Sequence, residues 1–193
     1  MTAPSAASIR IIGIAFAALV VLAGAGCGTS SDQERPPACP RVSVLGDAAN
    51  LTRFAEGAGQ DLVDVDYQVE VTDVHSGCQY VNNEADEQVV VVATAPVMVA
   101  IRGPANSDRV ARFDYFVSVI DSKRSVLNKQ VFSMQMEFPG NLTRVTLRDD
   151  DQPVTVDIPL AAGGAAGDYQ ILVGLQLTPD ELEYNLRRRS TPR

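Results

Sequence analysis

The feature that most constrains the fold is a strict alternation of apolar and polar side chains in the segment LVDVDYQVEVTD, residues 62–73. A period of two places one set of side chains on each face of an extended chain, whereas a helix would scatter the apolar set around its circumference. The pattern therefore predicts a β-strand with one dry and one wet face. The residues expected on the dry face are Val63, Val65, Tyr67, Val69 and Val71.

Later segments repeat this signal. The run QVVVVATAPVMVAIRG (88–103) is apolar on both faces, which indicates a central strand that is bent or ended near Pro96, because proline cannot donate to a ladder. Two alternating runs, RVARFDYFVSVID and VFSMQMEF, flank the polar stretch SKRSVLNK, so we expect a hairpin with its turn there. Further strands are expected on both sides of an acidic turn at residues 149–151 and in DYQILVGLQL at 168–177.

Strands at these intervals, with Gly, Pro and Asp between them, predict an all-β domain over residues 39–193. The expected architecture is an antiparallel β-sandwich of about seven or eight strands, with a barrel as the alternative. The run GDYQILVGL resembles the late strand of immunoglobulin-like and fibronectin-like domains, in which a tyrosine bonds back to the preceding turn. That resemblance covers one strand and implies an immunoglobulin-like sandwich.

One short helix is expected at the C-terminus, in TPDELEYNLRRR at about residues 178–189. Thr178 and Glu181 have the spacing of a capping box, acidic residues lie early and arginines lie late. Leu182 and Leu186 are spaced to dock on one face. A helix of about three turns is marginal alone, so we expect it to pack on the sandwich, with a basic tail at phospholipid head groups as the alternative.

The N-terminus carries a targeting segment. Residues 11–26 contain no charge, and the run ends in small residues before Cys27. It is shorter than a typical membrane-spanning helix, so a secretory signal is favoured over a retained helix. Ala23 to Gly26 followed by Cys27 resemble the lipobox of bacterial lipoprotein precursors, and the chain as a whole resembles small bacterial lipoproteins. The resemblance implies a signal peptide at 1–26 and acylation of Cys27; an ordinary secretory peptide remains the alternative.

The cysteine count agrees with this interpretation. The chain has three cysteines, and lipidation of Cys27 leaves Cys39 and Cys78, which can close a disulfide in an oxidising compartment. The alternative is a free buried pair. Residues 27–38 are polar and proline-bearing and form the expected tether, which holds the folded part near the bilayer. In the lipoprotein family an Asp after the cysteine typically retains the protein in the inner membrane, so Gly28 implies sorting to the outer membrane, facing the periplasm.

Catalytic chemistry has little support in the sequence. His75 is the only histidine, and we interpret it as a surface or turn residue; Asp64 and Asp66 are interpreted as wet-face acids. The acidic turn at residues 149–151 lacks the ligand spacing of a calcium loop. Met134 and Met136 share a face with phenylalanines, which favours core packing over copper binding. We therefore expect no catalytic residue, metal or cofactor. The NLTR sequences, which begin at Asn50 and Asn141, are read as turns or strand starts.

Charge and architecture then restrict the function. The formal net charge is −8, and removal of residues 1–26, whose only charged side chain is Arg10, makes it one unit more negative. So acidic a chain disfavours nucleic acid as a partner. The leading hypothesis is a lipid-anchored binding, assembly or structural module of a Gram-negative cell envelope with a protein partner. The alternatives are a ligand- or lipid-binding accessory of an envelope transport system, a hydrolase using two carboxylates, and a module whose exposed sheet edge pairs with a partner strand.

Overall fold

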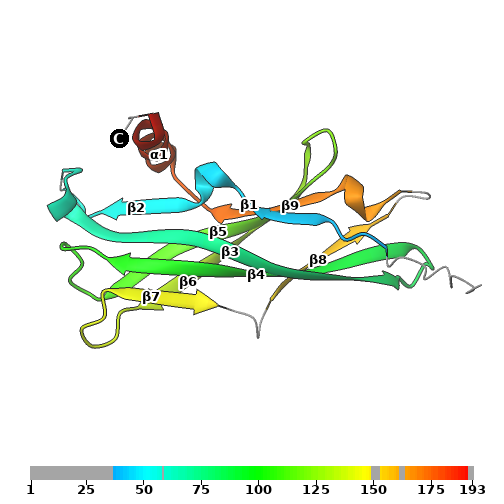
Figure 1. The fold of residues 1–193 in the computed structure, drawn as a ribbon, viewed down its shortest axis with the longest axis horizontal. Helices are drawn as coiled ribbons and strands as arrows, with labels where there is room; N and C mark the ends of the chain where they lie inside the picture. Colours follow the sequence, from blue (N-terminus) through cyan, green and yellow to red (C-terminus); the bar gives the residue numbers. More distant parts are fainter. Residues whose placement is uncertain (1–36, 58, 149–152, 161–163, 191–193) are drawn as a thin grey trace, which may run out of the picture. The chain divides into compact units, whose positions relative to one another are not determined.

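A computed structural model of the chain describes residues 37–57, 59–148, 153–160 and 164–190. Within these residues the fold is mostly β, with two sheets and one short C-terminal helix (Figure 1). The expected signal peptide, Cys27, all but the last two residues of the expected tether, and the acidic turn at residues 149–151 lie outside the described residues. Within the described part, no helix is long and apolar enough to span a membrane.

One sheet has four strands and the other five. The four-stranded sheet runs in the order β1 (Arg41–Val44), β9 (Gln170–Leu175), β5 (Val110–Ile120) and β6 (Val126–Glu137). The five-stranded sheet runs in the order β2 (Asn50–Phe54), β3 (Val65–Asn82) and β4 (Gln88–Arg102), and both β7 (Arg144–Arg148) and β8 (Val154–Pro159) pair with the far side of β4. Short 3-10 turns are η1 (Gly46–Ala48), η2 (Leu62–Asp64) and η3 (Ala166–Asp168).

The expectation of an all-β domain is confirmed, with two corrections. The described residues form nine strands instead of about seven or eight, because the short strands β1 and β2 precede the alternating runs from which the strands were predicted. The sheets are also not wholly antiparallel, since β1 pairs with β9 in parallel.

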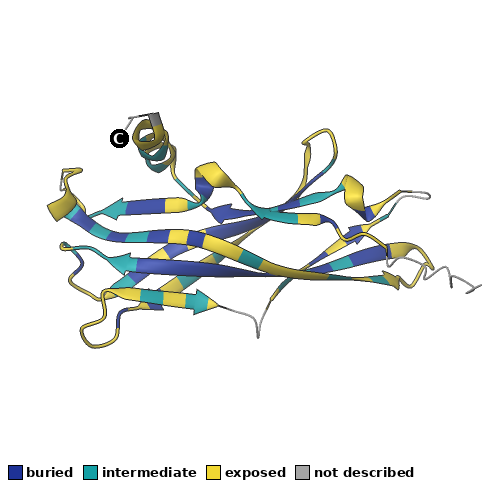
Figure 2. Cartoon of the chain, in the orientation of Figure 1, coloured by how far each residue is buried: buried dark blue, intermediate teal, exposed yellow. Residues whose placement is uncertain are grey.

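The core lies between the two sheets, and both contribute to it (Figure 2). β5 supplies Phe113, Tyr115, Val117 and Val119, all at most 5% exposed, as the alternating pattern predicted. Hydrophobic burial of this kind is the main favourable term in folding. The other fully or nearly fully buried members of the core include Leu51, Val69, Val90, Val92, Met98, Phe138, Ile171, Val173 and Leu175.

β3 follows the predicted alternation only in its first half. Val65, Tyr67, Val69 and Val71 are buried as expected, but Val63 lies in η2 and is 70% exposed. A bulge between Val71 and Asp73 then shifts the register against β4. An extra residue reverses the face on which each following side chain lies, so even-numbered residues point toward the core from there on. Val74, Cys78 and Tyr80 accordingly pack against the core.

β4 is the central strand that its two apolar faces predicted, but it does not end at Pro96. It runs unbroken from Gln88 to Arg102. On its far side, β8 pairs with residues 89–94 and β7 with residues 97–101. Pro96 therefore lies where one partner strand gives way to the next. Proline has no backbone N–H to donate to a neighbouring strand. The strand tolerates it here because the pairing on this side of β4 is interrupted.

The β5–β6 hairpin is confirmed, although its turn is shorter than the stretch SKRSVLNK. The chain reverses within residues 121–125, where the Asp121 carboxylate accepts hydrogen bonds from the backbone N–H groups of Lys123 and Ser125. Residues 126–129 already belong to β6. Because Asp121 satisfies the turn's backbone donors locally, the following residues are free to extend and pair with β5.

The expected helix is α1 (Pro179–Ser190), and its cap is the predicted one. The Thr178 N–H donates to the Glu181 carboxylate at 2.8 Å, and the Glu181 N–H donates to the Thr178 hydroxyl at 3.3 Å. The docking face differs from the expectation, because Leu182 and Leu186 are 38% and 46% exposed. The helix instead meets β2 through Tyr184, whose ring packs edge-on against Phe54 at 5.3 Å.

Candidate binding surface

The disulfide between Cys39 and Cys78 is formed, which confirms the predicted pairing. Cys78 lies in the second half of β3, where the bulge has turned it inward. Cys39 lies two residues before the start of β1, so the bridge links the start of the four-stranded sheet to the five-stranded one. The Tyr80 hydroxyl reinforces the junction by donating to the Ala38 carbonyl at 2.7 Å. The segment before β1 is thus held against the second half of β3.

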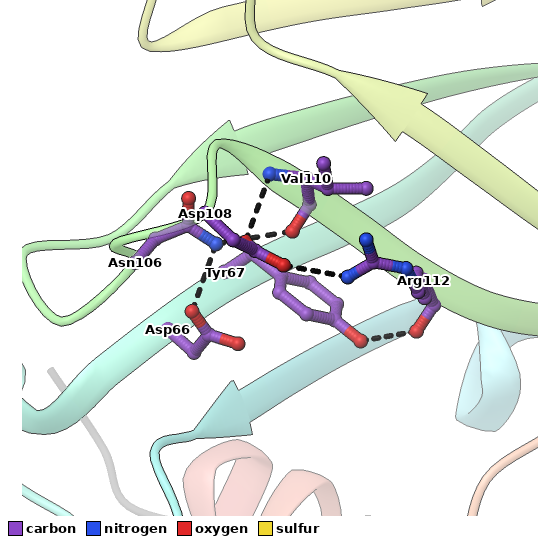
Figure 3. Close-up of polar contacts among 6 residues, drawn as sticks. All are labelled: Asp66, Tyr67, Asn106, Asp108, Val110 and Arg112. Atoms are coloured by element: carbon purple, nitrogen blue, oxygen red, sulfur yellow. Dashed lines mark hydrogen bonds and ion pairs between the residues drawn. The ribbon is translucent and has the colours of Figure 1, made fainter.

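A polar cluster joins the loop after β4 to the first residues of β3 and β5 (Figure 3). Asn106 is 1% exposed, and its side-chain amide nitrogen donates to the Asp66 carboxylate at 2.8 Å and to the Val110 carbonyl at 3.0 Å. The Tyr67 hydroxyl donates to the Arg112 carbonyl. These bonds hold the loop against β3 and β5. Asp66 is therefore not simply a wet-face acid, as the sequence had suggested, but a partner in loop anchoring.

Asp108 is the second acid in this cluster, and its environment keeps it ionised. A hydrogen bond from the Arg112 guanidinium at 2.6 Å, together with the Val110 N–H at 3.1 Å, lowers the pKa of the Asp108 carboxyl below its usual value. A general acid needs a raised pKa, so this carboxylate has the opposite property. The cluster has the chemistry of a structural network, in which each carboxylate accepts bonds that position a loop.

Surface hollows among the described residues are open grooves with mixed linings. One, of about 360 Å³, lies between α1 and the β2–β3 face and is lined by Thr52, Gln68, Glu70, Asn185 and Arg188, among others. Another, of about 500 Å³, lies where β5, β6 and the end of β9 meet. Ligand pockets are usually concave and mostly apolar with a few polar groups. The groove beside α1 brings together opposite charges, Glu70 and Arg188.

The remaining residues singled out from the sequence occupy ordinary structural positions. His75 lies in β3 with its side chain 44% exposed and 4.0 Å from the Asp73 carboxylate. Met136 is buried and Met134 packs against the core. The first NLTR begins a strand, since Asn50 is the first residue of β2, and the second lies at a turn before β7. Asp64 accepts the Asp61 N–H at 3.2 Å. Within the described ranges, no group of three His, Cys, Asp or Glu side chains is placed to hold a metal.

The edges of the sheets are the surfaces best suited to binding another protein strand, because an edge presents unpaired backbone N–H and C=O groups. The edge of β2 is covered by α1: the Asn185 amide donates to the Asn50 carbonyl at 2.7 Å. A salt bridge of 2.8 Å between Arg53 and Glu181 lies beside it. Arg189 further pairs with Asp47 and the Gly46 carbonyl on η1. The helix therefore protects this edge.

The edge of β6 is long and has no such cover among the described residues. β6 spans 12 residues at the end of the four-stranded sheet and pairs only with β5. Val126, Leu127 and Val131 are 64%, 55% and 50% exposed. The first residues of β6 lie in the stretch SKRSVLNK, where we expected a polar turn, so the full length of this edge strand was not predicted. The run VLNKQV, residues 126–131, contains apolar residues within this polar stretch, and they were the available signal that the strand begins earlier.

Comparison with known proteins adds no assignment. No protein-family profile matches the chain, and no curated protein or solved structure shows significant similarity to it.

Proposed function

We propose that this protein is a lipid-anchored binding or assembly module of the bacterial cell envelope, attached through Cys27 and acting without catalysis. The observation that carries the proposal is the Cys39–Cys78 disulfide. It uses two of the three cysteines, so the odd cysteine is the one that follows the apolar N-terminal run. A bridge of this kind is also typical of compartments outside the cytosol.

The position of the folded part supports the same proposal. Its first described residues, 37–40, directly precede β1 and are held by the bridge at Cys39. Only about ten residues separate Cys27 from this point, a distance of at most roughly 35 Å when fully extended. An acylated Cys27 would therefore keep the sheets beside the membrane surface. Gly28 supports the outer membrane, with the domain in the periplasm. We further propose that the sheets form a variant immunoglobulin-like sandwich, which is supported by two sheets that share one buried core.

Mass spectrometry of the N-terminal peptide tests the anchor. The full-length protein is extracted from membranes with detergent and digested, and the peptide that begins at Cys27 is expected to carry acyl chains. A Cys27→Ser variant is the matched control, and its N-terminal peptide should carry no acyl chain, because serine offers no thiol to which the lipid can be attached. A wild-type peptide that spans residues 26–28 with an unmodified Cys27 would refute the proposal.

A further inference from the structure

Among the described strands, β6 differs from the other edges in how little it is protected. β1, β7 and β8 are four to six residues long, and short edge strands pair poorly with other chains. β2 is covered by α1. The second half of β3 is joined by the Cys39–Cys78 disulfide to the segment before β1. β6 is twice as long as β8 and contains no proline.

The two charges of β6 also fail to block its edge. Lys129 and Glu137 are its only charged residues. Proteins commonly protect edges with charged residues, prolines, bulges or inward-pointing charges. The register irregularity of β6 lies at its start, between Val126 and Asn128, and leaves the rest of the strand regularly paired with β5. Here, however, the Lys129 ammonium lies on the outer face of the sheet, 4.4 Å from the centre of the Phe116 ring, and Glu137 is the last residue of the strand. The middle of β6, from Gln130 to Met136, is uncharged.

We infer that β6 pairs with β6 of a second copy of this chain, antiparallel, around a two-fold axis at Ser133. In this register Lys129 of each copy lies opposite Glu137 of the other. The dimer therefore contains two Lys129–Glu137 pairs, one at each end of the paired strands. Opposite charges that face one another across an antiparallel pair are stabilising. An isologous contact of this kind requires one surface that complements itself, which the positions of Lys129 and Glu137 provide.

The same register is consistent with the two faces of the sheet. Phe132 and Met134 both lie on the core side of β6, and they would face each other across the axis. Lys129 and Glu137 share the outer face with Ser133, because side chains alternate along a strand. A register centred on Lys129 would instead place two ammonium groups opposite each other, which is destabilising. Charge therefore selects among the possible registers, all of which keep the backbone pairing.

The expected affinity is modest in solution. One pair of edge strands buries less surface than a standard interface of about 1,600 Å², so we expect a dissociation constant on the order of 10 μM. Anchoring to a membrane would raise the effective concentration of the two copies. The inference thus rests on the proposed function for its strength in the cell, but the pairing itself is independent of the lipid.

Charge reversal at the two ends of β6 tests the pairing by sedimentation equilibrium, up to about 0.5 mM protein. All variants are full-length and carry Cys27→Ser, so that the lipid has no part in the result. Lys129→Glu and Glu137→Lys, made separately, should each weaken the dimer by about tenfold or more, because like charges then face each other twice. The double variant should recover most of the affinity. Thermal unfolding of each variant shows whether the fold is retained.

A cysteine at the proposed axis provides the second test. In the Cys27→Ser protein, Ser133→Cys should form a disulfide-linked dimer under mild oxidation, because Ser133 is exposed and faces its own copy. Thr146→Cys, on the exposed face of β7, is the matched control and should crosslink much more slowly. A monomer at all concentrations, equal crosslinking at both sites, or failure of the double charge variant to recover would each overturn the inference. An acylated Cys27 with a monomeric domain would overturn the pairing and leave the anchor intact.

Discussion

Removal of the Cys39–Cys78 bridge is expected to destabilise the domain by about 4 kcal/mol. The two cysteines are 39 positions apart in the sequence. In the chain-entropy relation, a closed loop of that length removes about 13 cal/mol/K from the unfolded ensemble, which gives about 4 kcal/mol at 25 °C. Because the bridge also holds the start of β1 against β3, the native state would lose an attachment as well. That is a large fraction of the stability of a typical domain, about 5–15 kcal/mol.

The assay is equilibrium unfolding in urea, followed by far-UV circular dichroism because the chain has no tryptophan. The variant is Cys39→Ala with Cys78→Ala, since a single substitution would leave a reactive thiol. Cys27→Ser is the control for removal of a cysteine outside the bridge and should leave the midpoint unchanged. We also expect a steeper denaturant dependence in the double variant, because its unfolded chain is less compact. A loss below about 1 kcal/mol would refute the reasoning that the bridge restricts the unfolded chain.

Three further substitutions test individual contacts. Gly103→Ala should lower the free energy of unfolding in urea by at least about 3 kcal/mol, because a Cβ there would lie 2.0 Å from the Val65 carbonyl oxygen. Gly77→Ala is the control. A Cβ at Gly77 would have no atom within 4 Å, so this substitution should change stability by less than about 0.5 kcal/mol. Tyr67→Phe should cost about 1 kcal/mol at neutral pH through loss of the bond to Arg112. Burial raises the pKa of Tyr67 above 10.0, so the unfolded tyrosine ionises first as pH rises and wild-type stability should fall above about pH 10. The phenylalanine variant should lose less over that range, and equal alkaline slopes would contradict this assignment. Thr178→Ala should cost about 1 kcal/mol and Thr178→Ser much less, since serine keeps the capping oxygen; an equal loss in both would argue against the cap.

The candidate site could be predicted only in part. The Cys39–Cys78 pair followed from the cysteine count together with the lipobox resemblance, because acylation of Cys27 leaves only these two to pair. The β6 edge did not follow, since whether a strand is at an edge depends on which strands pair with it, and pairing is non-local. Likewise, nothing in the spacing of Asp66 and Asn106 indicates that their side chains meet, as they lie 40 residues apart and are joined by the crossing of a loop over β3.

The sequence by itself determined the local structure: the strands of β4 and β5, the hairpin between β5 and β6, and the capped helix at Thr178. Period, turn residues and capping act between neighbours in the chain, so they can be read without a fold. Only the tertiary structure decided the second half of β3. There a bulge reverses the faces, moving His75 outward and Cys78 inward, where it meets Cys39.

The tertiary structure also decided which side of α1 is buried. The leucine spacing predicted one docking face, but the helix packs along the edge of β2 through Tyr184 and Asn185 and leaves Leu182 and Leu186 exposed. An edge strand offers carbonyl groups that must be satisfied, and an amide meets that need where a leucine does not. The sequence specifies which elements form, while the competition among distant backbone and side-chain groups for partners specifies how they pack.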